Sequence, residues 1–310
     1  MPYTSSMHAL VAGATGFIGG VLVRRLLADD AHVRALVRDR ERARGKLAED
    51  PRLELFVGDV LEPATLDGAG AGIDVAYYLV HSMGRGEGGD FEEREARSAR
   101  AFAQMCAKAG VGRIVYLGGL GDEPGSKHLR SRDATARMLA EHGPPLTYFR
   151  AGMVVGAGSE SYRTLRHLVA RLPVMIAPRW LSTPTQPIDI DDVVEYLATA
   201  PRVQASAGRE VQIGSPDVLP YSAMLDRMAT ALGRRHRPKI PVPLLTPRLS
   251  SLWIGLVTPV DTRVARPLIE GLSTETVVTD PSGAALFGVS PIGFDESLRK
   301  AVLAERAGEP

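Results

Sequence analysis

The sequence predicts an α/β fold in which a doubly wound, mostly parallel sheet is followed by a smaller C-terminal substrate lobe. Three observations support this prediction. Short apolar runs alternate with helical patterns through about the first half of the chain. A glycine-rich turn joins the first apolar run to the first helical pattern, and prolines interrupt the alternation after Gly156.

The first turn is the stretch VAGATGFIGG at residues 11–20, which carries Gly13, Gly16 and Gly19. In such a turn the first glycine permits the tight bend, the second lets a phosphate approach the main chain, and the third lets helix pack on strand. The positive end of the following helix then faces the anion. The motif predicts a Rossmann-type domain that binds a dinucleotide, although a lone glycine triad also occurs in turns by chance.

Further apolar runs have the length and composition of strands. They lie at residues 32–37, 53–57, 73–80, 113–117 and 146–149, and helical patterns lie at 91–109 and 131–141. Repeated strand and helix units form a parallel sheet with helices on both faces, and ligands bind at the carboxyl ends of the strands. We therefore assign residues 1–155 to the Rossmann domain that binds the cofactor.

The rhythm changes after residue 156, where prolines become frequent. Residues 188–200 have a helical pattern that begins near Asp191 or Asp192, and we expect this segment to return to the main sheet. Residues 156–187 and 201–310 are assigned to the smaller lobe on the substrate side.

The composition is that of an ordinary globular chain, with 310 residues, 45% hydrophobic and 24% charged. The formal net charge is +1, which gives no general electrostatic attraction to nucleic acid. Cys106 is the single cysteine and lies in a helical pattern, so we expect a buried small hydrophobic residue and a reducing cytoplasm.

The N-terminus lacks the pattern of a secretory signal, and no uncharged apolar stretch reaches the roughly 18 residues of a membrane-spanning helix. The segment 249–260, which contains Trp253, is apolar but shorter. It fits a helix that associates with a membrane surface, or packing in the core or between the two copies of a homodimer.

Several stretches resemble the atypical short-chain dehydrogenase/reductase superfamily, and its NmrA-like NAD(P)-binding branch most closely. These are VAGATGFIGG at 11–20, VRALVRD at 33–39, GDV at 58–60 and RAGMVVGAG at 150–158. YYLVHSM at 77–83, LPVMIAPRW at 172–180 and TPRLSSLWIGLVTP at 246–259 resemble a bacterial subgroup of NAD(P)-binding proteins. The resemblance covers nearly the whole chain and implies the fold. A shared fold, however, does not determine which substrate a protein uses.

The resemblance implies that the first turn lies under the pyrophosphate, through Gly13, Thr15, Gly16, Phe17, Ile18 and Gly19. Arg38 ends the second expected strand, where a guanidinium pairs with the 2′-phosphate of NADP(H). Asp39 would suit the ribose of NAD(H), but an aspartate there more often caps the next helix. The expected cofactor is therefore NADP(H), with NAD(H) as the alternative. Arg34 and Arg42 are either further phosphate ligands or surface charges.

The resemblance also implies cofactor contacts from residues that follow the third and fourth strands: Asp59, Val60, Leu79, Val80 and His81. The Asp59 carboxylate would accept a hydrogen bond from the adenine amine, or would cap a helix instead. His81 and Ser82 are candidates to contact the nicotinamide ribose or a substrate carbonyl. They open the glycine-rich loop 81–90, which fits either an active-site edge or a plain connection.

Usual short-chain reductases carry a tyrosine four residues before a lysine, and this pair is absent here. The matching segment, HLRSRDATARML at 128–139, offers His128 and Arg132 at that spacing. Arg132 is a candidate to hold the cofactor ribose, and His128 is a candidate acid or base. Gly118 and Gly119 replace the serine or threonine that the family places on the preceding strand.

Other proton donors and other chemistries find little support in the sequence. Tyr77, Tyr78 and Tyr116 could donate a proton only if their rings face the cleft, whereas aromatic residues in strands are more often core. The sequence lacks a nucleophile elbow and any spacing typical of metal ligands, so no metal is predicted.

The leading expectation is an NADPH-dependent oxidoreductase that transfers hydride to a small apolar acceptor. A quinone or an activated enone suits the altered catalytic pair better than a simple ketone, because it needs little acid catalysis. One alternative is a non-catalytic NADP(H)-binding redox sensor. Another is an accessory or assembly protein that docks residues 249–260 on a membrane complex.

Overall fold

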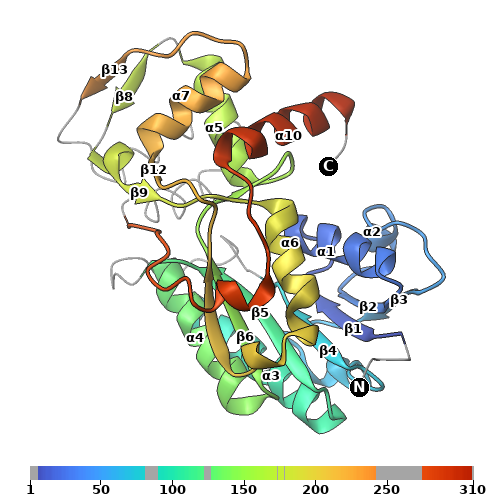
Figure 1. Ribbon diagram of the computed structural model, residues 1–310. Coiled ribbons are helices and arrows are strands. Elements are labelled where there is room, and N and C mark those ends of the chain that lie inside the picture. Colours follow the sequence, from blue (N-terminus) through green and yellow to red (C-terminus); the bar gives the residue numbers. More distant parts are fainter. Residues whose placement is uncertain are drawn as a thin grey trace.

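A seven-stranded parallel sheet forms the centre of the computed structural model, which describes residues 6–80, 90–121, 127–172, 174–177, 179–241 and 274–308 (Figure 1). Its strands are β1 (His8–Ala12), β2 (His32–Val37), β3 (Leu53–Val57), β4 (Val75–Tyr78), β5 (Arg113–Gly119), β6 (Leu146–Ala151) and β11 (Arg209–Ile213). The strand order is β3, β2, β1, β4, β5, β6, β11. Strands β2 and β3 are therefore added on one side of β1, and β4 and the later strands on its other side. The predicted doubly wound α/β fold is confirmed.

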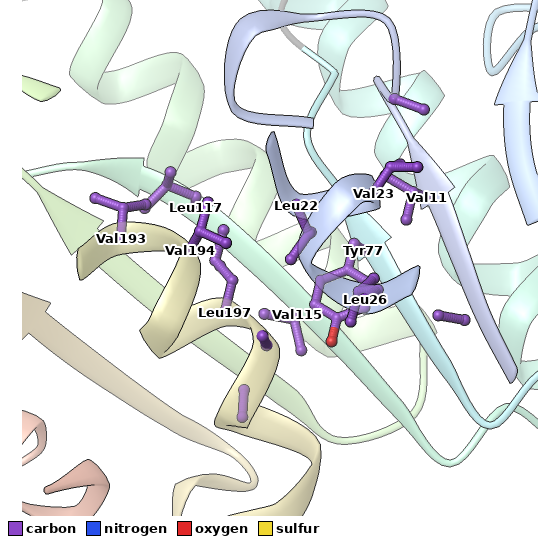
Figure 2. Close-up of a cluster of buried hydrophobic side chains, with 14 of the residues drawn as sticks. Val11, Leu22, Val23, Leu26, Tyr77, Val115, Leu117, Val193, Val194 and Leu197 are labelled. Atoms are coloured by element: carbon purple, nitrogen blue, oxygen red, sulfur yellow. The ribbon is translucent and has the colours of Figure 1, made fainter. Parts of the chain in front are cut away.

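Helices cover both faces of this sheet. One face carries α1 (Phe17–Ala28), the short α2 (Arg40–Arg44) and α6 (Ile190–Thr199), and the other carries α3 (Asp90–Ala109) and α4 (Lys127–His142). Successive side chains of β1 point to opposite faces of the sheet, so each face has its own apolar core. Val11 packs under α1 in the first core, whereas Leu10 faces α3 in the second. Figure 2 shows the first core, in which Leu22 of α1 and Leu197 of α6 meet the sheet.

The α6 segment therefore packs on the central sheet, in the same apolar cluster as β1 and β5. One assignment from the sequence needs correction at this edge. Residues 209–213 were placed in the smaller lobe, but β11 pairs with β6 in register from Arg209 opposite Thr147 to Ile213 opposite Ala151. Val211 and Ile213 are fully buried in the first core, and this burial fixes the strand at the sheet edge.

A second group of elements has its own apolar core and lies above the sheet in Figure 1. Its helices are α5 (Glu160–Arg171), α7 (Tyr221–Ala231) and α10 (Phe294–Ala307), and its short strands are β7 (Val154–Val155), β8 (Met175–Ala177), β9 (Pro184–Thr185), β10 (Ile188–Asp189), β12 (Leu219–Pro220) and β13 (Lys239–Pro241). Single 3-10 turns are η1 (Pro63–Leu66), η2 (Arg179–Ser182), η3 (Ala200–Arg202), η4 (Gln204–Ser206) and η5 (Ala284–Phe287). Within the described ranges, none of the helices combines the length and apolar composition needed to cross a membrane.

Charged contacts join this smaller lobe to the sheet domain at the start of α6. The buried Asp189 caps α6 by accepting the Asp191 N–H at 3.0 Å, and Lys300 of α10 binds both carboxylates, at 2.8 and 2.7 Å. Half-buried Asp192 accepts the Ile292 N–H at 2.9 Å. Burial, with Asp189 and Asp191 nearby, raises the pKa of Asp192 to about 6, against the opposing effects of Ile292 and Lys300.

This raised pKa makes the Asp192 contribution to stability depend on pH. The contribution is fully present below pH about 4, where the carboxyl is protonated in both states, and is lost as pH rises through 6. Asp192→Asn keeps an acceptor for Ile292 but cannot ionise. We expect the melting temperature of the variant to exceed that of the parent at pH 7, with a smaller difference at pH 4. Parallel pH profiles for the two proteins would contradict the assignment.

Candidate dinucleotide site

The turn after β1 requires a glycine at its first position. Gly13 has a φ of +89°, and a Cβ built on it would lie 2.5 Å from the carbonyl oxygen of Leu79. The main chain of the turn therefore lies in close contact with the segment that follows β4. Leu79 is held there by its own N–H, which donates to Ala12 at 2.9 Å.

Gly19 is required by the packing of α1. A Cβ at this buried position would overlap the carbonyl oxygen of Gly13, so any side chain would push the helix away from the turn. Gly13 and Gly19 therefore serve the fold itself, as well as whatever the turn binds.

Gly16 differs from its two neighbours because the fold alone does not demand it. It is exposed, its φ of −80° suits any residue, and an added Cβ would meet only the Gly13 oxygen, at 3.2 Å. The missing side chain leaves the turn open from the solvent side. This is the position at which a bound phosphate would approach the main chain.

The start of α1 is also open. Gly16 provides no side-chain cap and the first turn holds no acidic residue. The start of α7 shares both features, whereas side chains of Asp39, Ser159 and Asp189 cap α2, α5 and α6. The first N–H groups of α1 are thus left for another acceptor, at the positive end of a 12-residue helix. An anion satisfies both features.

The other predicted residues of this turn have separate roles. Thr15 and Ile18 are partly exposed beside Gly16. The Phe17 ring packs under the loop after β7, since a Cβ on either Gly156 or Gly158 would lie 2.7 Å from it. Only the Phe17 main chain is therefore positioned toward a ligand.

The end of β2 provides one guanidinium that no described residue binds. Arg38 is exposed, and within the described residues it forms neither a hydrogen bond nor an ion pair. Asp39 accepts the Arg42 N–H at 3.0 Å and caps α2, as the sequence favoured. Arg34 is occupied, because it binds Glu54 at 2.7 Å and backbone carbonyls of the loop after η1. Arg34 is therefore a structural residue.

The residues that come after β3 and β4 lie at the same carboxyl edge of the sheet. Asp59 accepts the Leu61 N–H at 3.0 Å, which closes a local turn and leaves its second oxygen free of described partners. Val60 is buried, and Leu79 and Val80 are partly buried. His81 and Ser82 lie outside the described residues.

A second guanidinium without a partner lies near the end of β5. Half-buried Arg132 of α4 places Nη1 3.5 Å from the position that a Cβ on Gly119 would take. In the part of the chain that the structure describes, this guanidinium has no hydrogen bond or ion pair. His128 lies one turn earlier in α4, but its side chain lies outside the described residues.

The candidate tyrosines are core residues. Tyr77, Tyr78 and Tyr116 are 0%, 2% and 0% exposed, and desolvation raises the pKa of each phenol. Cys106 is likewise buried, and burial raises its pKa to about 12, which leaves an unreactive thiol.

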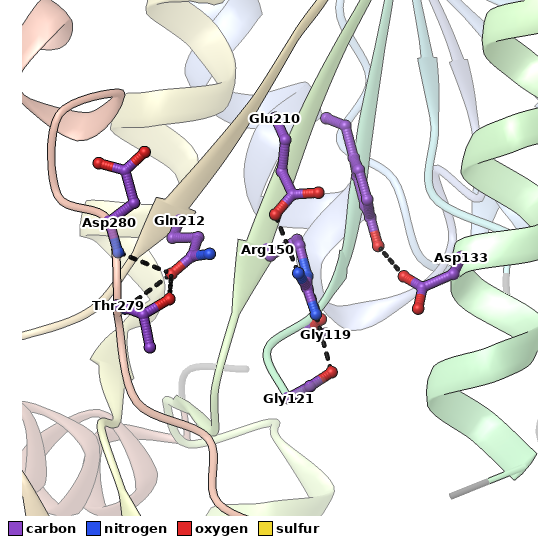
Figure 3. Close-up of polar contacts among 9 residues, drawn as sticks. Gly119, Gly121, Asp133, Arg150, Glu210, Gln212, Thr279 and Asp280 are labelled. Atoms are coloured by element: carbon purple, nitrogen blue, oxygen red, sulfur yellow. Dashed lines mark hydrogen bonds and ion pairs between the residues drawn. The ribbon is translucent and has the colours of Figure 1, made fainter. Parts of the chain in front are cut away.

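Sequence reasoning did not identify two residues behind the β5 turn, Tyr148 and Arg150 of β6. The Tyr148 hydroxyl lies 2.7 Å from where a Gly118 Cβ would be, and donates to Asp133 at 3.0 Å. Buried Arg150 donates to the carbonyls of Gly119 at 3.0 Å and of the turn beyond it, and pairs with Glu210 at 2.9 Å (Figure 3). An arginine within the mainly apolar strand run LTYFRA is the signal that the sequence offers.

The carboxyl ends of β1, β2, β4 and β5 thus present an open glycine turn, a helix without a side-chain cap and, counting only partners within the described part of the chain, two unpaired guanidinium groups. A sequence family described as NAD(P)H-binding matches residues 13–151. These residues form an NAD(P)H-binding domain. The matched residues include every cofactor residue predicted from the sequence.

One curated protein and several solved structures resemble the chain beyond the NAD(P)H-binding domain. A ceramide reductase of Caulobacter vibrioides is 29% identical over 166 residues, which are 53% of this chain and 52% of that protein. The chain thus aligns with about half the length of this curated relative.

Solved structures match almost the whole fold. A nucleoside-diphosphate-sugar epimerase of Staphylococcus aureus has a TM-score of 0.72 at 15% identity, covering 94% of this chain and 100% of that one. A Citrobacter sp. triphenylmethane reductase complexed with NADP(H) has a TM-score of 0.71 at 19% identity, covering 95% and 100%. A Bordetella bronchiseptica enzyme in complex with NAD+ has a TM-score of 0.71 at 15% identity, covering 97% and 99%. At these identities the likeness concerns the fold.

Proposed function

We propose that the protein is an NADPH-dependent reductase that transfers hydride to a small apolar acceptor, such as a quinone or an activated enone. One observation carries the proposal. Along the carboxyl edge of the sheet, the groups able to bind a phosphorylated cofactor have no partner among the described residues: the start of α1, Arg38 and Arg132.

Arg38 supports NADP(H) rather than NAD(H). Its guanidinium is free to pair with a 2′-phosphate, and Asp39 is engaged in capping α2 rather than facing a ribose. A positive group also suits the extra charge of the phosphate. Similar folds are named in complex with NADP(H) and with NAD+ alike, so the preference is our inference from Arg38.

Within this proposal, the cofactor supplies the hydride and the chain orients it. The start of α1 would bind the pyrophosphate, and Arg132 would donate to the ribose beside the end of β5. A proton donor is scarce among the described residues, because burial raises the pKa of Tyr116 and Tyr148, and Tyr148 already donates to Asp133. His128 is proposed as the acid if the acceptor needs one.

A site with little acid catalysis favours acceptors that take hydride readily. Quinones and enones accept it at a conjugated, electron-poor position, and the charge that develops is delocalised. The names of the similar proteins, a ceramide reductase and a triphenylmethane reductase, support reduction as the reaction class. The acceptor itself is our inference from the site.

Turnover is tested by mixing purified protein with NADPH that carries deuterium at C4 and with a panel of quinones and enones. We expect NADPH oxidation with at least one acceptor. With an enone, deuterium from only one face of the nicotinamide should appear on carbon in the product; with a quinone, NADPH oxidation alone is the readout, because deuterium on a hydroquinone oxygen exchanges with water. Tight NADPH binding without transfer to any acceptor would contradict the enzyme proposal.

Cofactor preference is tested by Arg38→Gln. We expect NADPH affinity to fall about 10- to 100-fold, because a charge-assisted pair is lost, while NADH affinity stays within about twofold. Arg24→Gln, at an exposed position of α1, is the matched control and should change neither affinity. Calorimetric titration measures both cofactors. Equal losses for NADPH and NADH would place Arg38 away from the 2′-phosphate.

A redox sensor is the second candidate, favoured by the burial of Tyr77, Tyr78 and Tyr116, which keeps their hydroxyl groups in the core. A sensor must bind NADPH and NADP+ with different affinities, because equal affinities shift no equilibrium. Titration with both forms distinguishes it. A large affinity difference together with no turnover supports the sensor.

A further inference from the structure

A groove of about 470 Å³ lies between α4 and the outer strands β6 and β11. It arises because α4 is the outermost described helix on its face of the sheet, while β6 and β11 extend past it. The size falls within the range of small-molecule sites. The groove is separate from the edge that carries Gly16 and Arg38.

The groove has an apolar floor and charged walls. Ala136 and Ala140 of α4 face Leu146 and the Tyr148 ring of β6 across it. Leu146 and Tyr148 are 6% and 7% exposed, so the floor is well packed. Such a floor suits a flat ring or a short acyl chain.

The charges along the walls leave a surplus of positive groups. The two acids are engaged, since Asp133 accepts the Tyr148 hydroxyl and Glu210 pairs with Arg150 (Figure 3). Arg137 of α4 and Arg209 of β11 are exposed and have no hydrogen-bond or ion-pair partner among the described residues. A ligand that complements these walls carries a negative charge.

The floor of the groove is also the back of the β5 turn. The Tyr148 ring lies against Gly118, and Arg150 binds the carbonyls of Gly119 and Gly121, at 3.0 and 2.8 Å. Arg132 lies at the same turn, beside Gly119. A ligand that moves Tyr148 or Arg150 would therefore change how this turn meets the proposed cofactor site.

We propose that this groove binds a small organic anion with an apolar body and that its occupancy changes the affinity for NADPH. The site stands on the groove alone, whereas the coupling rests on the proposed cofactor function. Binding at the two sites is coupled reciprocally, so each ligand changes the affinity of the other by the same factor.

Binding is tested with 1-anilinonaphthalene-8-sulfonate, an aromatic anion whose fluorescence rises in apolar sites, added to protein saturated with NADPH. Its neutral relative N-phenyl-1-naphthylamine tests the need for charge. Ala140→Trp fills the groove from an exposed helix position, and Arg137→Gln and Arg209→Gln each remove one cation. Arg97→Gln, at an exposed position on α3, is the matched control.

We expect saturable binding of the anion that Ala140→Trp weakens at least about tenfold and that each arginine variant weakens about three- to tenfold, with no change in the control. The neutral probe should bind less tightly than the anion. Equal binding by parent and Ala140→Trp would overturn the site. A dimer that Ala140→Trp dissociates in sedimentation would also overturn it, in favour of a second copy of the chain.

Coupling is measured by titrating NADPH with and without saturating anion. We expect the NADPH dissociation constant to change at least about threefold in the parent and to stay constant in Ala140→Trp. Groove-dependent anion binding with an unchanged NADPH affinity would overturn the coupling. Absence of NADPH binding to any variant would instead contradict the proposed cofactor function, while the anion titrations would still test the groove.

Discussion

Gly16→Ala is expected to weaken NADPH binding by about 10- to 100-fold while the chain keeps its fold. The added methyl group would occupy the open side of the turn, where a phosphate approaches the main chain. Within the protein it meets only the Gly13 oxygen, at 3.2 Å, and the φ of −80° tolerates alanine. Loss of a glycine N-cap costs about 1 kcal/mol, which lowers the melting temperature by only about 2 °C in a chain of this size.

Gly19→Ala is the matched comparison, because the same methyl group has the opposite effect there. Its Cβ would overlap the Gly13 carbonyl, so α1 must shift and the packing of Leu22 and Leu26 on the sheet is disturbed. We expect a loss of about 3 kcal/mol or more in the free energy of unfolding. Thermal melts and NADPH titrations of both variants separate the two roles. Unchanged NADPH affinity in a folded Gly16→Ala protein would contradict the proposed pyrophosphate site.

The central sheet could be predicted from the sequence because its signals are local. Each strand is a short apolar run, and the turn glycines Gly13 and Gly19 fit the constraints that the structure imposes on them. The role of Asp39 as a helix cap was also predictable, since an aspartate before a helix needs only its own neighbours.

The edge strand β11 could not be placed in this way. Three of the five residues in its sequence, REVQI, are polar, and its partner β6 lies about 60 residues earlier in the chain. Burial of Val211 and Ile213 against α6 decides its position, and that packing appears only after the sheet has formed.

Arg34 and Arg150 show why charged residues in strands are hard to interpret. The sequence left Arg34 open as a phosphate ligand, but its partners are Glu54 and carbonyls some 35 residues away. Arg150 reaches Gly119 and Glu210, which are 31 and 60 residues distant. Such contacts depend on tertiary structure. An unpaired arginine at the carboxyl edge, by contrast, indicates a site only once the structure shows that nothing binds it.

Arg132→Met is expected to lower NADPH affinity by about 10- to 100-fold, because it removes the donors that we assign to the ribose. Arg132→Lys should lose less, since an ammonium keeps the charge and can still donate. Neither variant should change the free energy of unfolding by more than about 0.5 kcal/mol, because the guanidinium has no described partner to lose.

A loss of NADPH affinity without a loss of stability distinguishes a cofactor ligand from a structural arginine. Arg150→Met supplies the contrast, because the Arg150 side chain is 8% exposed and its loss would leave the carbonyls of Gly119 and Gly121 and the Glu210 carboxylate without this donor. That variant should lower the melting temperature clearly. If Arg132→Met destabilises the fold as much as Arg150→Met, or leaves NADPH binding unchanged, the guanidinium near Gly119 does not hold the cofactor. If only binding falls, the unpaired arginine is a ligand of NADPH.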